Sequence, residues 1–268
     1  MKTSERKRAL ECAVQAAQAA GKVIRDNAHL SKTISSSSQH DIKLELDVRC
    51  QKLIERSLQK DFPEVPLLGE EGESGDTTAE RRWVVDPIDG TVNFTYGVPH
   101  ACVCIALQEK ATNPRASGYP DGYATLIGVV YDPFCHETWT AIRGQAAQLN
   151  GKRIRVSKRR NLTEAIVSIG FAKTKENLDR TLPYFNELVH RVRKIRIMGS
   201  AALALTYVAS GRFDAYIESG ISLWDIAAGG LILERAGGEF WRQPIPGRHA
   251  YRMVATNGLL RKTLRVRY

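Results

Sequence analysis

Acidic side chains occur at three points where an apolar segment of the chain gives way to a turn or a helix. Asp86 and Asp89 lie three residues apart after one apolar run, Glu70 follows a second, and Asp225 opens a segment rich in Ala and Gly. Carboxylates of this kind can bind hard divalent cations. Each segment also has a structural explanation, because Asp, Pro and Gly favour turns and an aspartate can cap a helix. Taken one at a time, the three segments leave both interpretations open.

Taken together, these segments are far more specific. Gly-Glu-Glu at 69–71, Asp-Pro-Ile-Asp-Gly-Thr-x-Asn-Phe at 86–94 and Trp-Asp-Ile-Ala-Ala-Gly at 224–229 occur in this order. In these motifs the chain resembles the inositol monophosphatase family, from its first helix to about Asn257. The resemblance implies a lithium-sensitive, Mg²⁺-dependent phosphatase of small polar phosphate esters that forms a homodimer. Its expected substrate is myo-inositol 1-phosphate.

The resemblance also implies a set of metal ligands. Glu70, Asp86 and the backbone carbonyl of Ile88 would hold one Mg²⁺, and Asp86, Asp89 and Asp225 a second, with two or three ions per subunit. The grouping is physically reasonable, since carboxylates packed together without cations repel one another. Magnesium prefers oxygen ligands and retains water molecules beside a substrate phosphate.

Further site residues are implied in the same way. Thr91 matches the position whose hydroxyl orients the attacking water, with Glu70 beside it and Asp47 hydrogen-bonded behind the threonine. These three are the predicted catalytic residues. Gly90 lacks a Cβ atom, so its backbone N–H and that of Thr91 can approach a phosphate at the start of a helical turn.

The expected contacts to the rest of the substrate involve both halves of the chain. Glu218 matches an acidic position that contacts sugar-like hydroxyl groups, and Ser200 and Ala201 match an adjacent wall of the site. Asp89 and Asp225 are expected to contact the substrate as well. For Ser200 an ordinary helix cap is an equally good explanation.

One segment departs from the pattern of inositol-type members. Many of them carry Asp-x-Val-Thr-x-x-Asp before the second helix, whereas residues 41–47 read Asp-Ile-Lys-Leu-Glu-Leu-Asp and lack the threonine. This difference leaves fructose 1,6-bisphosphate, histidinol phosphate and a 3′,5′-bisphosphate nucleotide open as alternative substrates.

A function of another class is binding to RNA or to the transcription machinery, with residual phosphatase activity. The net charge is +10, and basic residues cluster at 152–160, 191–196 and 261–267. Such charge attracts either anionic metabolites or nucleic acid. Because all the expected metal ligands are present, we favour the enzyme and do not expect nucleic acid as a partner.

The overall composition is that of a globular protein without a membrane span. Of 268 residues, 43% are hydrophobic and 25% charged, and the longest apolar runs are far shorter than the roughly 20 residues that a spanning helix needs. The N-terminal segment lacks the apolar core of a secretory signal, which predicts a cytoplasmic protein. The five cysteines are expected to be free thiols. Cys102 and Cys104 share a strand face that could suit a metal, although small buried hydrophobic residues explain them more simply.

The order of the expected elements predicts an α/β (α+β) fold. Apolar periodicity indicates helices at 4–28 and about 46–62, with a polar loop at 35–38 between them. An antiparallel meander is expected from three strands joined by short turns and by a long hairpin loop at 109–124. Alternating strands and helices follow from 165 to 236.

We therefore expect a layered αβαβα sandwich of the inositol monophosphatase and fructose-1,6-bisphosphatase type. An N-terminal α+β half, 1–150, would carry most metal ligands. A C-terminal α/β half, 151–268, would complete the substrate site.

Overall fold

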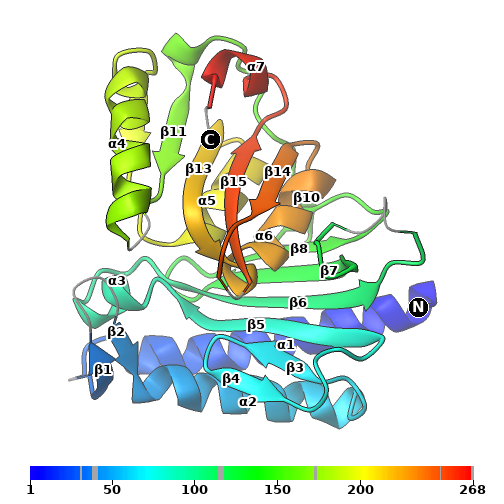
Figure 1. Ribbon diagram of the computed structural model, residues 1–268. Helices are drawn as coiled ribbons and strands as arrows, with labels where there is room; N and C mark the ends of the chain where they lie inside the picture. The colour runs from blue at the N-terminus through cyan, green and yellow to red at the C-terminus, as the bar shows by residue number, and fades with distance from the viewer. Residues whose placement is uncertain (31, 38–41, 114–117, 172–173, 248, 267–268) are drawn as a thin grey trace.

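The structure is a computed structural model that describes residues 1–30, 32–37, 42–113, 118–171, 174–247 and 249–266. It consists of five layers: a pair of helices, an eight-stranded sheet, a second pair of helices, a five-stranded sheet and an outer helix (Figure 1). Three hydrophobic clusters fill the spaces between these layers. The predicted layered αβαβα sandwich is confirmed.

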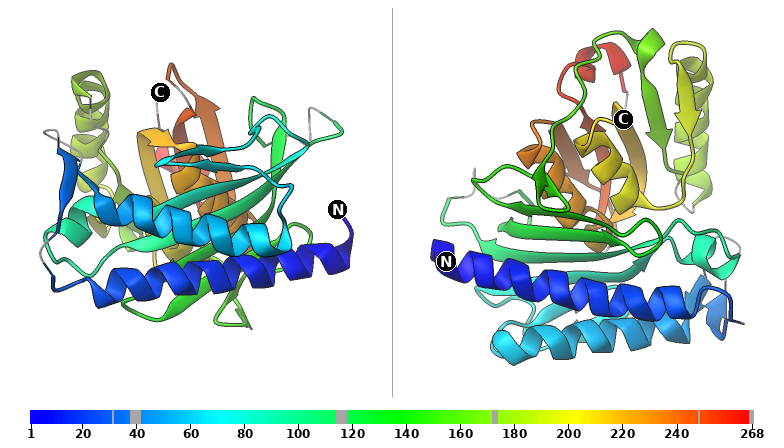
Figure 2. Two further views of the ribbon diagram at one scale, coloured as in Figure 1. Left: turned by 90° about the horizontal axis from the view of Figure 1, so that it is seen from below. Right: turned by 180° about the vertical axis from the view of Figure 1, so that it is seen from behind.

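The first layer contains α1 (Thr3–Asp26) and α2 (Glu45–Asp61), which lie side by side across one face of the large sheet (Figure 2, left). The buried face of α1 consists mainly of alanines, so its backbone lies close to the strands. Both helices match the predicted apolar periodicity. No helix in the described ranges is long and apolar enough to cross a bilayer.

The eight-stranded sheet forms the second layer. Its strands in spatial order are β10 (Lys152–Arg153), β9 (Gln148–Leu149), β8 (Glu137–Ile142), β7 (Tyr123–Asp132), β6 (Cys102–Lys110), β5 (Arg81–Asp89), β3 (Leu67–Gly69) and β4 (Gly72–Ser74). Strands β6 to β8 form the predicted antiparallel meander. All of β7 is buried because helices cover both faces of the sheet, an arrangement more usual for parallel sheets.

A β-bulge interrupts the pairing of β5 with β6 at the end of β5. Asp86 is opposite Cys104 and Asp89 is opposite Cys102, so three steps along β5 match two along β6. In a regular strand, residues three apart point to opposite faces. The extra residue of a bulge re-aims the side chains that follow it, and thus Asp86 and Asp89 reach the same side.

The remaining layers come from the C-terminal part of the chain. The middle helices are α5 (Ala201–Ala209) and α6 (Leu223–Arg235), and α4 (Lys175–Val189) covers the outer face of the second sheet (Figure 1). The strands of that sheet, in order, are β12 (Lys194–Arg196), β11 (Ile166–Ile169), β13 (Ala215–Ser222), β15 (Ala250–Thr256) and β14 (Glu239–Pro244). Helix α6 packs tightly on the first sheet, since a Cβ atom on Gly128 would lie 2.7 Å from the carbonyl oxygen of Ala228.

Some elements differ from the expectations. The loop predicted at 35–38 begins within β1 (Ile34–Ser37), which pairs with β2 (Ile42–Leu44); its position 38 lies outside the described residues. A run of serines has no apolar alternation, so nothing in the sequence indicated the strand. Strands β14 and β15 were not predicted either. The division of the chain near residue 150 stays a prediction, and β10, just beyond it, pairs with β9 in the first sheet.

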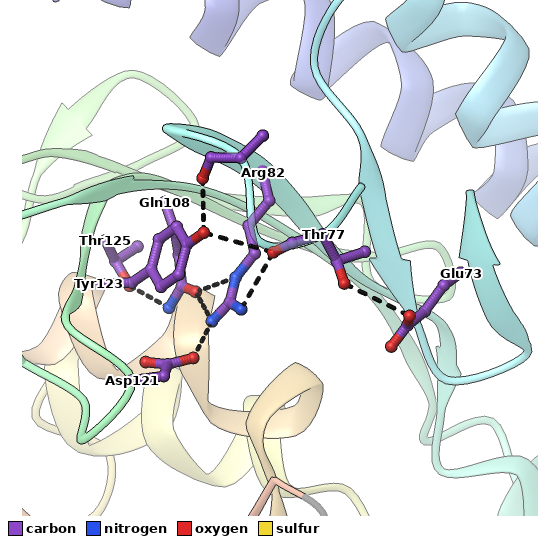
Figure 3. Close-up of polar contacts among 8 residues, drawn as sticks. Glu73, Thr77, Arg82, Gln108, Asp121, Tyr123 and Thr125 are labelled. Carbon is purple, nitrogen blue, oxygen red and sulfur yellow. Dashed lines mark hydrogen bonds and ion pairs between the residues drawn. The ribbon is translucent and has the colours of Figure 1, made fainter. Parts of the chain in front are cut away.

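The connection between β6 and β7 is shorter than the predicted loop, because β6 extends to Lys110 and β7 begins at Tyr123. Buried Arg82 holds the end of this connection in place where it meets β7 (Figure 3). The guanidinium donates to Gln108 at 2.8 and 3.0 Å, pairs with Asp121 and lies 3.8 Å from the centre of the Tyr123 ring. None of the described residues of this connection lines the cavity described below.

Replacing Arg82 with alanine should lower the free energy of unfolding by about 2 to 3 kcal/mol, since it leaves buried Gln108 without its donor and also removes the ion pair with Asp121. Arg82 is only 4% exposed. The matched control is Arg8→Ala, which removes an ion pair with Asp61 whose side chains are 61% and 43% exposed; because solvent screens an exposed pair of this kind, its loss should have little effect. Urea denaturation midpoints measure both, and equal losses would contradict the assignment of Arg82 as an anchor.

Candidate functional site

A cavity of about 440 Å³ lies between the first sheet, the middle helices and the second sheet. It is bordered by the ends of β5 and β11, the five-residue helix α3 (Thr91–Thr95), the starts of α5 and α6, and β13. Ten of the eleven predicted site residues line it, and these are Glu70, Asp86, Ile88, Asp89, Gly90, Thr91, Ser200, Ala201, Glu218 and Asp225. Segments far apart in sequence thus meet at one place.

Three carboxylates form the centre of this site. Oxygen atoms of Asp86, Asp89 and Asp225 all lie within 4.8 Å of one another. The bulge in β5 brings the first two to the same side, and the first turn of α6 supplies the third. Glu70, which directly follows β3, lines the same cavity.

Burial and mutual repulsion disfavour the ionised forms of these groups. Burial, followed by the nearby Glu70 and Asp225 carboxylates, raises the pKa of Asp86 well above its ordinary value. Burial and the charge of Asp89 do the same to the pKa of Asp225. The cluster is therefore strained electrostatically unless cations or protons compensate it.

Asp89 is held by several donors from the start of α5. The Ser200 hydroxyl donates to its carboxylate at 2.6 Å, and the backbone N–H groups of Ala201 and Ala202 donate at 3.2 and 2.8 Å. These bonds favour the charged form, but burial outweighs them and the pKa of Asp89 is raised. Ser200 is the N-cap residue, yet its side chain makes no capping hydrogen bond. Its hydroxyl positions Asp89 instead.

Asp225 is oriented by its own helix. Its Oδ2 atom accepts a hydrogen bond from the backbone N–H of Ser222 at 3.0 Å. This is half of a capping box, so the structural explanation of Asp225 applies alongside its place in the cluster.

Gly90 has a conformation that other residues rarely adopt, with φ of 97°. A Cβ atom there would lie 2.9 Å from the carbonyl oxygen of His100 and 3.2 Å from that of Gly199. Glycine is required for this close approach. At the next position, the Thr91 hydroxyl donates to the carbonyl of Ile88 at 2.8 Å.

Asp47 is the one predicted site residue that does not line the cavity. It is buried in the first turn of α2, where its Oδ2 atom accepts the backbone N–H of Leu44 at 2.7 Å. Leu44 occupies the N-cap, where a threonine could have donated or accepted a hydrogen bond. Because a leucine replaces the threonine of the family pattern at position 44, the N-cap side chain cannot accept a hydrogen bond from the helix. Of the two hydrogen bonds of a capping box, the one to Asp47 is formed.

Glu218 lies on β13, in the second sheet, and lines the cavity. It accepts a hydrogen bond from the hydroxyl of Tyr216, two residues earlier on the same strand face. A Cβ atom on Gly170 would lie 1.9 Å from its carboxylate, so this glycine makes room for the side chain.

Asn93 is a site residue that was not predicted. Its side-chain amide donates to the carbonyl of His100 at 2.9 Å and to that of Met198 at 2.8 Å. It thereby ties α3 to the loop before α5, across the cavity wall. Its place within the 86–94 motif was the available signal.

The donor set suits hard divalent cations. Five acidic residues line the cavity, whereas its described lining includes no Lys, Arg or His. Oxygen-only ligands, several of them buried carboxylates with raised pKa values, are what Mg²⁺ binds in preference to softer donors. The residues present therefore fit the expected magnesium, while the number of ions stays a prediction.

Comparison with known proteins gives one consistent family. A profile of the inositol monophosphatase family matches residues 5–243. A Nus factor SuhB from Pseudomonas aeruginosa is 40% identical over 237 residues, covering 85% of this chain and 83% of the relative. Inositol monophosphatase 1 from Solanum lycopersicum is 38% identical over 236 residues, covering 85% and 82%.

Solved structures agree with these sequence relatives. The extragenic suppressor protein SuhB from Bartonella henselae superimposes with a TM-score of 0.84 at 32% identity, covering 96% of both chains. An IMPase from Thermotoga maritima gives a TM-score of 0.81 at 31% identity, covering 95% of this chain and 94% of the other.

Proposed function

The chain belongs to the inositol monophosphatase family and is a phosphoric monoester hydrolase, and we propose that its substrate is myo-inositol 1-phosphate. The observation that carries the proposal is that two acidic groups line one cavity. The carboxylate cluster comes from β5 and the start of α6, and Glu218 comes from β13 of the second sheet. A phosphate is expected at the cluster, and the polyol hydroxyls can donate to Glu218.

Charge supports a monophosphate over a bisphosphate. A second phosphate, as in fructose 1,6-bisphosphate or a 3′,5′-bisphosphate nucleotide, needs its own positive partner. No described residue of the cavity lining carries a positive charge. Histidinol phosphate, which is itself cationic, remains the strongest competing substrate.

In the proposed reaction the chain's own residues bind and orient the reactants. Glu70, Asp86, Asp89, Asp225 and the Ile88 carbonyl would hold magnesium, which supplies Lewis-acid stabilisation of the phosphoryl oxygens and the departing oxygen.

The remaining roles belong to groups near α3. The Gly90 and Thr91 N–H groups would orient the phosphate. Glu70 would accept the proton of the attacking water, and the Thr91 hydroxyl would help to orient that water. Asp47 would act on Thr91 from behind the cavity wall; in the structure Thr91 donates to the Ile88 carbonyl and Asp47 accepts from Leu44.

The test is phosphate release in the presence of Mg²⁺ from a panel of myo-inositol 1-phosphate, fructose 1,6-bisphosphate, histidinol phosphate and adenosine 3′,5′-bisphosphate. We expect the highest kcat/KM with myo-inositol 1-phosphate. Glu218→Gln should reduce it mainly through KM, because the amide keeps the size of the side chain but donates where the carboxylate accepted. A higher kcat/KM for any other member of the panel would overturn the substrate assignment.

Lithium inhibition, a homodimer and a cytoplasmic location complete the proposal by analogy with the family. Inhibition of phosphate release by LiCl, with KCl as the control, tests the first. Sedimentation equilibrium tests the second. A monomer at all accessible concentrations would remove the dimer from the proposal.

A second candidate function is RNA binding, which a clustering of basic residues favours. The N–H of Arg193 donates to Ala165 at 3.0 Å, and Asn257 donates to the carbonyl of Arg159 at 2.8 Å. These contacts bring basic segments together at the end of the second sheet where β11 begins, beside α7 (Arg261–Leu264) at the top of Figure 1. The exposed basic residues there are Lys158, Arg160, Arg193, Lys194, Lys262 and Arg265.

This basic end lies away from the catalytic cavity, which is at the other end of β11. We expect Arg193→Glu/Lys194→Glu to weaken RNA binding and to reduce the salt slope by about 1 to 2, because an RNA phosphate without its cationic partner retains its condensed counterions. The control Lys7→Glu/Lys22→Glu makes the same change of charge on α1, at the opposite side of the molecule. Equal weakening by both pairs, or no RNA binding at low salt, would remove this second function.

A further inference from the structure

Two buried thiols lie directly behind Asp89. Cys102 and Cys104 are opposite Asp89 and Asp86 in the pairing of β6 with β5, and both are essentially inaccessible. The Sγ atoms are 3.8 Å apart, and Cys102 Sγ is 3.6 Å from Asp89 Oδ2. One ligand atom from each of Asp89, Cys102 and Cys104 lies within 4.8 Å of the other two.

The two separations that involve Cys102 match edges of a tetrahedral zinc site. Zn–S bonds of about 2.3 Å at tetrahedral angles place two sulfurs about 3.8 Å apart. With a Zn–O bond of about 2.1 Å, the sulfur-to-oxygen edge is about 3.6 Å. The Sγ–Sγ and Sγ–Oδ2 distances in the structure agree with these edges without movement of the backbone.

We propose that Asp89, Cys102 and Cys104 form a binding site for a thiophilic divalent cation of the Zn²⁺ class. Sulfur ligands select such ions over Mg²⁺. Three protein ligands leave a fourth position for water or for the Ser200 hydroxyl, which is 3.8 Å from Cys102 Sγ. Each thiol releases its proton to solvent as its sulfur becomes a ligand.

The proposed site adjoins the cavity through two of its residues. Asp89 and Ser200 both line the cavity, and the thiols lie immediately behind them. Asp89 is therefore shared between a front site lined only by oxygen ligands and a rear site that contains sulfur. Occupation of the rear site would withdraw Asp89 from the front one.

The remaining cysteines lack this arrangement. Neither Cys12, Cys50 nor Cys135 belongs to a group of three potential ligands in the part of the chain that the structure describes. Replacing one of them removes a thiol from the protein but leaves the proposed site intact, so these residues serve as controls. Cys135 is exposed, and its replacement is not expected to disturb the core.

Titration with Co²⁺ tests the site without reference to catalysis. A bis-thiolate tetrahedral site should give a sulfur-to-cobalt charge-transfer band in the near ultraviolet and strong visible d–d bands, which added Zn²⁺ abolishes. Oxygen-only sites give no such charge-transfer band, so Co²⁺ in the front site does not mimic the result. Excess Mg²⁺ should raise the Co²⁺ concentration that is needed for the band, because both sites use Asp89, but it should not change the wavelength of the band.

The variants Cys102→Ala and Cys104→Ala should each weaken Co²⁺ binding by more than about 100-fold, since loss of an outer-shell partner alone costs about 10- to 100-fold. Cys135→Ser should leave the band unchanged. Circular dichroism identifies any variant that fails to fold, in which case Cys104→Ser replaces it. A wild-type protein without the band, or a band that survives both alanine variants, would overturn the proposal.

A second measurement concerns competition and rests on the proposed function. Micromolar Zn²⁺ should inhibit phosphate release by the wild type with an apparent affinity that Cys104→Ala weakens at least tenfold. Loss of all phosphatase activity together with an intact charge-transfer band would reject the proposed function and leave the cation site standing. Equal Zn²⁺ inhibition of both proteins would show that the rear site does not withdraw Asp89.

Discussion

Replacing Asp89 with asparagine should reduce phosphate release by at least about 1000-fold, a loss of about 4 kcal/mol of transition-state stabilisation. The variant keeps the size of the side chain but removes the negative charge. Its amide NH₂ would also face one of the N–H groups of Ala201 and Ala202, which now donate to different oxygens of the carboxylate. Steady-state kcat/KM at saturating Mg²⁺ measures the effect.

The matched control is Asp179→Asn, which makes the same chemical change on the exposed face of α4. It should retain the activity of the wild type. Thermal denaturation should show that both variants are folded. If Asp89→Asn were folded and fully active, Asp89 would have no role in metal binding during the reaction.

Magnesium should stabilise the folded protein, and more strongly at pH 8 than at pH 6. The pKa values of Asp86 and Asp225 are raised by burial and by neighbouring carboxylates. A raised folded-state pKa means that the folded, metal-free protein binds more protons than the unfolded chain. The stability that these protons confer is complete below the unfolded pKa of about 4 and is lost as pH rises toward the folded pKa.

Magnesium reverses this trend, because it binds the ionised carboxylates. At a concentration of about 100 times Kd, a ligand adds about 2.7 kcal/mol, which corresponds to a rise in Tm of about 5 to 10 °C for a chain of this size. Differential scanning fluorimetry with EDTA or with MgCl₂, at both pH values, measures the difference.

Asp225→Asn provides the control for both effects. It removes one charge from the cluster while its amide oxygen can still accept from Ser222. The metal-free variant should be more stable than the wild type at pH 8 and should respond less to Mg²⁺. If the metal-free variant were less stable than the metal-free wild type, the carboxylates of the cluster would not repel one another enough to destabilise the folded protein.

The parts of the fold with strong periodicity were predictable. Helices α1 and α2 follow from apolar residues at three- and four-residue intervals, and the meander from β-branched runs between turns. Strand β1 was missed because its serines show no apolar alternation. Strand β15 lies between β14 and the more distant β13, so its place in the sheet depends on residues outside its own hairpin. Such strands are stabilised by tertiary context more than by local preference.

The candidate site shows a similar division. Motif residues such as Asp86 and Asp225 were found because their order and spacing resemble a known family. The roles of Ser200 and Asn93 depend on contacts across the molecule, to Asp89 and to the Met198 carbonyl. No spacing rule could have indicated these contacts, nor the distance between Cys102 Sγ and Asp89.

The bulge between Asp86 and Asp89 makes chain length at this point as important as residue identity. Pro87 and Ile88 together occupy the space opposite one residue of β6, and a bulge leaves the extra residue outside the regular ladder of backbone hydrogen bonds. After deletion of either residue, the two aspartates would be two positions apart and would still share a face, as in a regular strand. The single residue left between them would return to the ladder of backbone hydrogen bonds. The carbonyl that is proposed to bind magnesium is thus a ligand that no side-chain substitution can remove. A survey of point mutants would find the acidic ligands and overlook this one, whereas a single-codon deletion would expose it.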